Sequence, residues 1–214
     1  MLKNIAISVI VGASLLGFVY YMTQGIKKPA TKDSLPYFRI DTVIGTDTVW
    51  HKVGDFNFIN QKGEHITQKN LDNYVYICDF FFVECPGICK DMAVQMRRVY
   101  KAYKDVPDVK ILSHTVNPEG DSIPALMEYA RIQGVDDHSK WIMVTGNKKE
   151  LYDMARIGYY ATATQGDGGP NDFVHTERFI LVDKNKNIRG FYDGTNENEV
   201  NKMMFDIDKL RKER

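Results

Sequence analysis

The sequence predicts an α/β fold, a sandwich in which a central mixed β-sheet is flanked by helices. Three observations support this prediction. Apolar strand-like runs alternate with helical patterns through the middle of the chain, an order typical of strands joined by crossover helices. Two further strand-like runs follow around a short polar turn, which indicates an added hairpin. An amphipathic helical pattern then ends the chain.

The expected strands share apolar runs bounded by turn-forming residues. The first run alternates between apolar and polar residues on both sides of the turn Gln61-Lys62-Gly63-Glu64, which predicts a β-hairpin. The run 74–83 is almost continuously apolar and predicts a buried strand. In order, the expected strands are 49–60, 65–67, 74–83, 109–116, 141–144, 179–183 and 188–191.

The expected helices share apolar residues that recur every three or four positions. Met92, Met96 and Val99 lie on one face of the first helix, which favours core packing over thioether ligation of a metal. Ser122 is the expected N-cap of the second helix, and Gly134 ends it. In order, the expected helices are 86–103, 122–133, 148–157 and 198–210.

The N-terminal segment 5–22 contains no charged residue and is almost entirely apolar. This length predicts a transmembrane helix, and the rival interpretation is a cleaved signal peptide. We therefore expect a membrane anchor at 1–26, a stalk or linker at 27–48 and one folded domain at 49–214. Either interpretation exports that domain, so we expect it on the extracytoplasmic (periplasmic) side of the membrane.

The composition excludes several classes of function. The 214 residues include 28 basic and 28 acidic side chains, so the balance indicates no nucleic-acid partner. The three cysteines are too few for a disulfide-stapled scaffold. Cys78 lies in the middle of a strand-like run and is expected to be a small buried residue.

Cys85 and Cys89 form a matched pair between the buried strand and the next helix. Pro86 suits the first position of a helix, which makes Cys85 the expected N-cap and predicts a lowered thiol pKa. A rise of about 1.5 Å per residue places the two Cα atoms roughly 6 Å apart. That separation suits a disulfide or two thiolates on one metal ion, so the pair is redox-active, metal-binding or both.

The chain resembles the Sco/SenC family, membrane-anchored proteins of copper handling with a thioredoxin-like fold. The resemblance covers most of the chain, from about Phe56 to Asp193. It departs from the family at Asn117, where an aspartate is usual, at Ile88-Cys89-Lys90, where a second proline is usual, and near Val83, where a threonine is usual. The matching motifs are Cys85-Pro86-x-x-Cys89, Val116-Asn117-Pro118-Glu119-Gly120-Asp121, Trp141-x-x-Val144-Thr145-Gly146 and Asp172-Phe173-Val174-His175.

The resemblance implies that Cys85, Cys89 and His175 bind a copper ion, as Cu(I) or Cu(II). It also implies a metallochaperone that delivers copper to the binuclear copper site of cytochrome c oxidase, or prepares the thiols of that site. The implied partners are a copper-receiving oxidase subunit and a thiol reductant. In this fold the loop that carries His175 packs against the cysteines, and Asp172 is a candidate to orient the His175 ring.

Two other functions remain open from the residues alone. The first is a membrane-anchored thiol–disulfide oxidoreductase, with Cys85 as the nucleophile and Cys89 as the resolving thiol. Three residues between the cysteines, where such enzymes usually have two, count against it. A related enzyme, a peroxidase, is disfavoured because no threonine lies just before Cys85.

The second function that remains open is a sensor of copper or redox state that uses the same ligands. The sequence favours a copper carrier over an enzyme.

Overall fold

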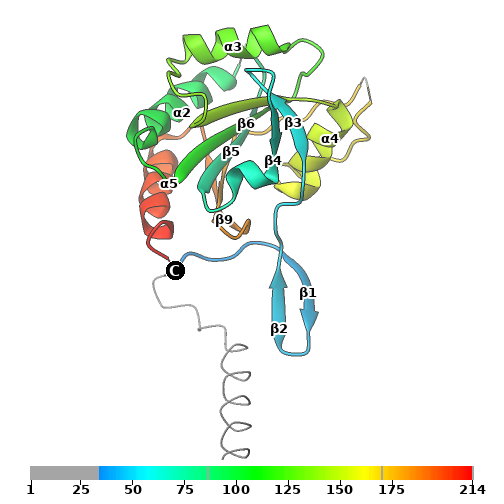
Figure 1. The fold of residues 1–214 in the computed structure, drawn as a ribbon. Coiled ribbons are helices and arrows are strands. Elements are labelled where there is room, and N and C mark those ends of the chain that lie inside the picture. The colour runs from blue at the N-terminus through cyan, green and yellow to red at the C-terminus, as the bar shows by residue number, and fades with distance from the viewer. Residues whose placement is uncertain (1–33, 86, 170, 214) are drawn as a thin grey trace, which may run out of the picture. The chain divides into compact units, whose positions relative to one another are not determined.

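A seven-stranded mixed sheet forms the centre of the fold (Figure 1). The computed structural model describes residues 34–85, 87–169 and 171–213. The strand order is β4-β3-β7-β6-β5-β8-β9, with β5, β6 and β7 parallel and the other neighbours antiparallel. The strands are β3 (Asn57–Asn60), β4 (His65–Thr67), β5 (Val75–Phe81), β6 (Val109–Thr115), β7 (Trp141–Thr145), β8 (Arg178–Val182) and β9 (Ile188–Asp193).

Helices cover both faces of this sheet. One face carries α2 (Cys89–Tyr103), α3 (Ile123–Ile132) and α5 (Glu197–Leu210). The other face carries α4 (Lys148–Asp153) and the π-helical turn η2 (Met154–Gly158), while the short 3₁₀ helix η1 (Gln68–Leu71) follows β4. This arrangement confirms the predicted α/β sandwich with a central mixed sheet.

The side chains of β5 alternate between the two faces, as a buried central strand requires. Ile77 and Phe81 pack into the core beneath α2, whereas Tyr76 and Cys78 pack into the core beneath α4. All seven residues of β5 are buried. The nearly continuous apolar run in the sequence therefore reflects a strand covered on both sides.

The helix boundaries follow local capping. The Ser122 side chain accepts the backbone N–H of Ala125 at the start of α3, and Gly134 adopts a φ of 75° just after its end. The Asn196 side chain accepts the backbone N–H groups of Asn198 and Glu199 at the start of α5. These positions agree with the boundaries expected from the sequence to within one or two residues.

Helix α2 begins later than predicted. Its first residue is Cys89 and its N-cap is Ile88, so the prediction that Cys85 caps the helix is wrong. The Cys85 backbone N–H donates to the Phe82 carbonyl at 3.4 Å, which shows that the chain turns after β5 before the helix can start. Cys85 therefore lies in the loop, and Cys89 occupies the first helical turn.

Residues 35–48, which the sequence assigns to a stalk, belong to the same compact unit as the rest of the fold. Leu35 is buried in the core, and its carbonyl accepts a hydrogen bond from Arg189 at 2.6 Å. The strands β1 (Ile40–Ile44) and β2 (Asp47–Trp50) pair as a separate antiparallel hairpin that projects from the sheet (Figure 1). The predicted strand 49–60 is accordingly divided between β2 and β3.

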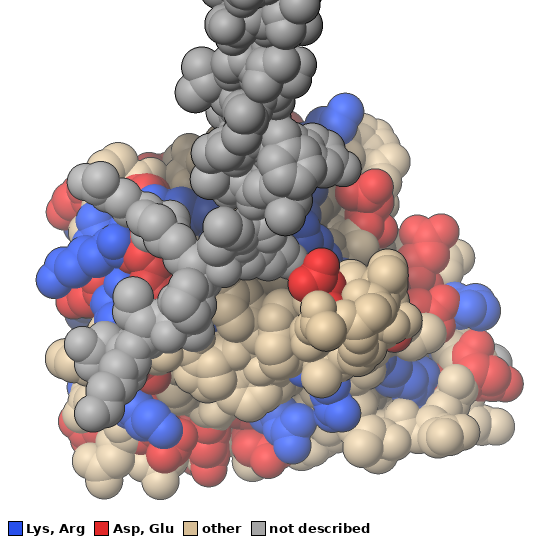
Figure 2. Space-filling model, turned by 90° about the horizontal axis from the view of Figure 1, so that it is seen from below, with Lys and Arg blue, Asp and Glu red and all other residues tan. Residues whose placement is uncertain are grey.

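The predicted anchor at 1–26 lies outside the described residues. Among the residues that the structure does describe, no helix has the length and apolar character needed to span a bilayer. Figure 2 shows basic and acidic side chains interspersed over the visible described part of the lower face. That mixture agrees with the equal numbers of charges in the sequence.

Candidate metal and thiol site

Cys85 lies in the loop between β5 and α2, and Cys89 is the first residue of α2. Cys85 and Cys89 are each 8% exposed, and both are free thiols. Each thiol is among the causes of the other's pKa shift, so the two groups lie near one another. The structure therefore brings the two predicted sulfur ligands together.

The environment separates the pKa values of the two thiols. Burial acts to raise the pKa of Cys85. The pKa nevertheless lies below 9.0, because the thiolate is stabilised by the Cys89 thiol, the backbone N–H groups of Gly87 and Cys89, and the charge of Lys90. Burial and the neighbouring Cys85 sulfur raise the pKa of Cys89 to about 12. The direction agrees with the predicted lowering at Cys85, but its largest lowering cause is the Cys89 thiol, followed by the backbone N–H groups of Gly87 and Cys89, and not a capping role.

A buried carboxyl group lies beneath the cysteines. Asp79 is 5% exposed. Its neighbours in β5, Cys78 and Phe80, point into the core beneath α4, so the Asp79 side chain lies on the opposite face, which α2 covers. Ser113, its partner in the register with β6, donates a hydrogen bond to this carboxyl group. Burial raises the pKa of Asp79 to about 7, and its charge contributes to the raised pKa of Cys89.

Asp79 was not predicted from the sequence as part of the site. The available signal was one acidic residue inside the apolar run 74–83, six positions before Cys85. An acidic side chain in a strand buried on both faces must find a partner or stay protonated.

The loop after β6 holds the cysteine loop in place. The Val83 backbone N–H donates to both oxygens of the buried Asp121 carboxyl group, each at 3.3 Å. Thr115 donates a further hydrogen bond to this group, and the Val116 backbone N–H donates to the Phe81 carbonyl at 2.8 Å. The matching segment 116–121 therefore fixes the backbone that leads into Cys85, with Asp121 as its central acceptor.

His175 lies in a loop that packs against the cysteine loop. The rings of Phe82 and Phe173 meet edge to face, with centroids 5.4 Å apart. Val174 and Thr176 are buried, whereas Phe173 and His175 are exposed, which is the alternation of an extended segment. His175 therefore lies on the same side of the loop as Phe173, the residue that contacts Phe82.

The structure does not gather the three predicted ligands into one cluster. Within residues 34–213, excluding 86 and 170, no three histidine, cysteine or acidic side chains lie close enough together to hold a metal ion. The structure brings Cys85 and Cys89 together and leaves His175 on the neighbouring loop. Ligation by His175 stays a prediction.

Asp172 has a different partner from the one predicted. Its two carboxylate oxygens accept hydrogen bonds from Arg156 at 2.6 and 2.8 Å, and it also accepts the Gly168 backbone N–H at 2.8 Å. The Arg156 pair lowers the pKa of Asp172. Asp172 thus ties the loop before His175 to η2 instead of orienting the His175 ring. Gly166 permits this contact, since an added Cβ would lie 2.3 Å from both carboxylate oxygens.

Cys78, Met92 and Met96 are buried, as predicted, together with His114 and Met203. Cys78 is fully buried, with its sulfur 3.5 Å from Nδ1 of His114. Burial lowers the pKa of His114 to about 3, so this ring is neutral. Met92, Met96 and Met203 are buried in the core between the sheet, α2 and α5.

A family model described as SCO1/SenC matches residues 46–211. The chain belongs to the SCO1/SenC family. The SCO1 protein homolog of Bacillus subtilis (strain 168) is 26% identical over 163 residues, 75% of this chain and 83% of that protein. Protein SCO1 homolog 1, mitochondrial, of Arabidopsis thaliana is 28% identical over 145 residues, which are 65% of this chain and 41% of that longer protein.

Solved structures of SCO1/SenC proteins share this thioredoxin-like fold. The structure of BsSco, described as a member of the Sco family of cytochrome c oxidase assembly proteins with a disulfide switch, aligns with a TM-score of 0.64 and 25% identity. The alignment covers 77% of this chain and 95% of BsSco. Arabidopsis thaliana ScoI, crystallised with copper bound, aligns with a TM-score of 0.59 and 24% identity over 76% of this chain and 100% of ScoI, which shows the shared fold.

Proposed function

We propose that this SCO1/SenC protein binds copper as its cargo through Cys85, Cys89 and His175. It delivers the ion to the binuclear copper site of a cytochrome c oxidase, or prepares the thiols of that site. The description of BsSco as an oxidase assembly protein and the copper bound to Arabidopsis thaliana ScoI support this proposal by relationship.

The paired thiols at the start of α2 are the observation that carries the proposal. Cys85 and Cys89 are both buried and each shifts the pKa of the other, and thiolates are soft ligands that favour Cu(I). The lowered pKa of Cys85 makes its thiolate the first available donor. The Cys89 thiol must lose its proton when the ion binds, so loading releases a proton and tightens as the pH rises.

His175 supplies the third ligand in this proposal. Its loop is held against the cysteine loop by Phe173 and Phe82, and its side chain is exposed. A neutral imidazole complements two thiolates at a copper site. A ligand on an exposed loop also leaves the ion open to thiols of a receiving protein, which transfer requires.

The proposed setting is the extracytoplasmic side of a membrane. The uncharged apolar segment 5–22 supports an N-terminal anchor, and the folded domain begins at Leu35. We place a copper-receiving oxidase subunit and a thiol reductant among the partners. The reductant is required because a disulfide between Cys85 and Cys89 would remove both sulfur donors.

Copper titration of the reduced full-length chain in detergent tests this function. We expect one copper per chain, with sulfur-to-copper charge-transfer bands for Cu(II), and loss of binding in Cys85→Ala and Cys89→Ala. His175→Ala should weaken binding, whereas the matched controls Cys78→Ala and His65→Ala should bind as the unmodified chain does. Absence of copper from the unmodified reduced chain would overturn the proposal.

The separation of the two thiol pKa values also favours a second candidate, thiol–disulfide exchange. The Cys85 thiolate would attack a substrate disulfide, forming a mixed disulfide and releasing one substrate thiolate. The Cys89 thiol, after losing its proton, would attack the Cys85 sulfur, releasing the second substrate thiolate and leaving a Cys85–Cys89 disulfide. A thiol reductant would restore the dithiol. Steady turnover of a disulfide substrate by a chain that binds no copper would favour this candidate.

A further inference from the structure

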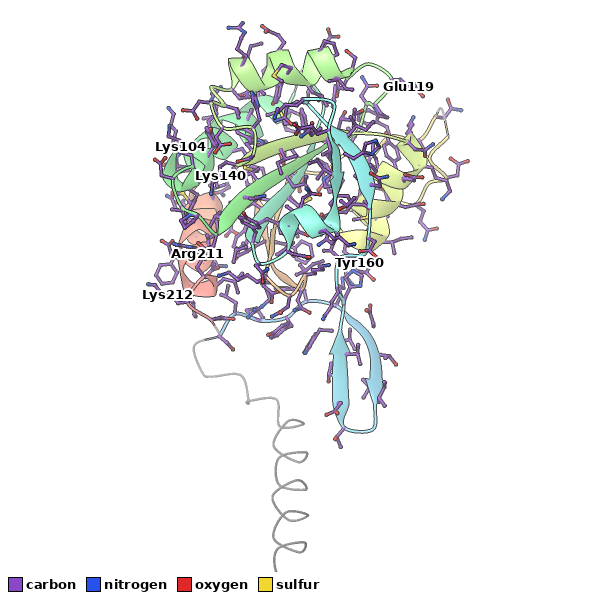
Figure 3. The ribbon with its side chains drawn as sticks, in the orientation of Figure 1. Lys104, Glu119, Lys140, Tyr160, Arg211 and Lys212 are labelled. Atoms are coloured by element: carbon purple, nitrogen blue, oxygen red, sulfur yellow. The ribbon has the colours of Figure 1, made fainter. Side chains whose placement is uncertain are left out.

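A surface cavity lies away from the cysteines. It has a volume of about 530 Å³, and its lining includes Arg39, Arg178, Ile157, Tyr160, Thr162 and Thr164. In Figure 3, Tyr160 lies beside the base of the β1–β2 hairpin, whereas Glu119 lies near the opposite end of the fold. Asp121, two residues after Glu119, holds the backbone that leads to Cys85. The cavity is therefore separate from the cysteines, and Arg156 in its lining binds Asp172 in the loop that carries His175.

Two guanidinium groups in this cavity have no acidic partner among the described residues. The Arg39 guanidinium lies 4.7 Å from the centroid of the Tyr160 ring. Arg178 lies over the Phe191 ring and donates weakly to the Tyr160 carbonyl at 3.4 Å. Throughout the part of the chain that the structure describes, neither has a carboxylate oxygen within 4.0 Å; Arg156, by contrast, is paired with Asp172.

The backbone around the cavity is strained at the two residues that meet across it. Arg39 has a φ of 64° and Tyr160 a φ of 50°, the left-handed region that non-glycine residues rarely adopt. Neighbouring contacts hold both residues. The His51 ring packs edge to face on the Tyr160 ring, with the ring centroids 4.8 Å apart. The His51 backbone N–H donates to the Arg39 carbonyl, and the Nε2 atom of His51 lies 2.9 Å from the Gly158 carbonyl oxygen. Such strain persists where the surroundings impose it, often at ligand sites.

The chemistry of the lining selects an anionic group next to an apolar one. Guanidinium groups bind carboxylates through paired, charge-assisted hydrogen bonds. The hydroxyl groups of Thr162 and Thr164 add neutral donors, and Ile157 is 63% exposed. Arg39 and Arg178 also line an adjoining hollow, which contains the acidic residues Glu177 and Asp193. These carboxylates would repel an incoming anion, so the anion is favoured in the cavity on the Tyr160 side.

We propose that this cavity binds an acidic segment of a partner protein. A carboxylate of that segment is held by Arg39 and Arg178, and an apolar side chain beside it covers Ile157. A small free anion would not need the exposed isoleucine or a cavity of this size. The proposal does not depend on copper binding, and it assigns partner docking to a surface separate from the thiols.

Fluorescence anisotropy with labelled peptides tests this assignment. The probes are a hexapeptide of alternating glutamate and leucine, and a matched peptide of glutamine and leucine. The full-length chain in detergent should bind the glutamate peptide at least ~10-fold more tightly than its glutamine counterpart, because one charged hydrogen-bonded contact contributes roughly this factor. An Arg39→Gln/Arg178→Gln variant should lose this preference.

Matched variants separate docking from general charge and from folding. Arg131→Gln removes an exposed arginine that is paired with Glu128 away from the cavity, and should bind as the unmodified chain does. A charge-reversed Arg178→Glu variant should prefer a lysine–leucine peptide, which a misfolded protein would not do. Equal binding of both peptides, or equal binding by the Arg39/Arg178 and Arg131 variants, would overturn the proposal. Binding of inorganic phosphate without peptide discrimination would overturn it in favour of a small-anion site.

Discussion

The separated pKa values of Cys85 and Cys89 predict which thiol reacts first. Cys85 titrates below 9.0, whereas Cys89 titrates at about 12. At pH 7 a thiol with a pKa near 9 is about 1 part in 100 thiolate, and one with a pKa near 12 is about 1 part in 10⁵. The reactive fractions therefore differ by about 10³ or more.

Intrinsic nucleophilicity reduces that difference without removing it. A less basic thiolate attacks more slowly, and a Brønsted coefficient of roughly 0.4–0.5 over about three pKa units lowers the ratio by roughly 15- to 30-fold. We therefore expect Cys85 to be alkylated at least about 30-fold faster than Cys89 at pH 7. The two residues have the same exposed fraction, 8%, so residue exposure alone does not predict the difference.

Alkylation of the reduced full-length chain by iodoacetamide, followed by digestion and mass spectrometry, measures both rates. As the pH rises from 7 to 9, the Cys89 rate should rise about tenfold per unit while the Cys85 rate levels off near its pKa. In Cys85→Ala, Cys89 should react faster than in the unmodified chain, because the Cys85 sulfur is one cause of its raised pKa. Equal rates, or faster labelling of Cys89, would refute the reasoning.

Three further predictions concern the surroundings of the site. Because folding raises the pKa of Asp79 to about 7, the folded state binds more protons than the unfolded state between about pH 4 and 7, and its stability falls as the pH rises through that range. Asp79→Asn should remove a part of this fall worth up to roughly 4 kcal/mol, measured by urea unfolding at pH 4 and 7.5; an unchanged pH profile would contradict it. Arg156→Met leaves Asp172 without its ion-pair partner and should lower the free energy of unfolding by about 2–3 kcal/mol. The double variant Arg156→Met/Asp172→Asn should lose less stability, and equal losses in the two variants would argue against a stabilising ion pair. Cys78→Ala should cost about 1 kcal/mol of stability through lost packing and leave copper stoichiometry unchanged, so any loss of copper would count against its structural assignment.

The order of strands and helices was predictable because each element leaves a local pattern. The apolar run at 74–83, the helical spacing of Met92 and Met96, and the cap at Ser122 are short-range signals, and the structure contains the corresponding elements. The closeness of Cys85 and Cys89 was predicted from helical spacing, but Cys85 lies in the loop before α2, so their short separation along the chain keeps them near each other instead.

The start of α2 was predicted wrongly because its position depends on tertiary contacts. Val83 is held by Asp121, 38 residues away in the sequence, and the turn at Phe82–Cys85 delays the helix to Cys89. The segment 35–48 was misassigned for a related reason. It lies within the predicted stalk at 27–48, but Arg189 binds the Leu35 carbonyl from more than 150 residues away.

By itself, the sequence determined the α/β class, the order of the elements, and a thiol pair between a buried strand and a helix. The tertiary structure decided which groups surround that pair. Asp79 lies beneath Cys89 because β5 is buried on both faces, and Arg156 binds Asp172 because η2 packs beside the loop before His175. Phe173 meets Phe82 across two loops that are far apart in the chain. The physical reason is that periodicity and capping act over a few residues, whereas burial, ion pairing and pKa values depend on neighbours that only the folded chain brings together.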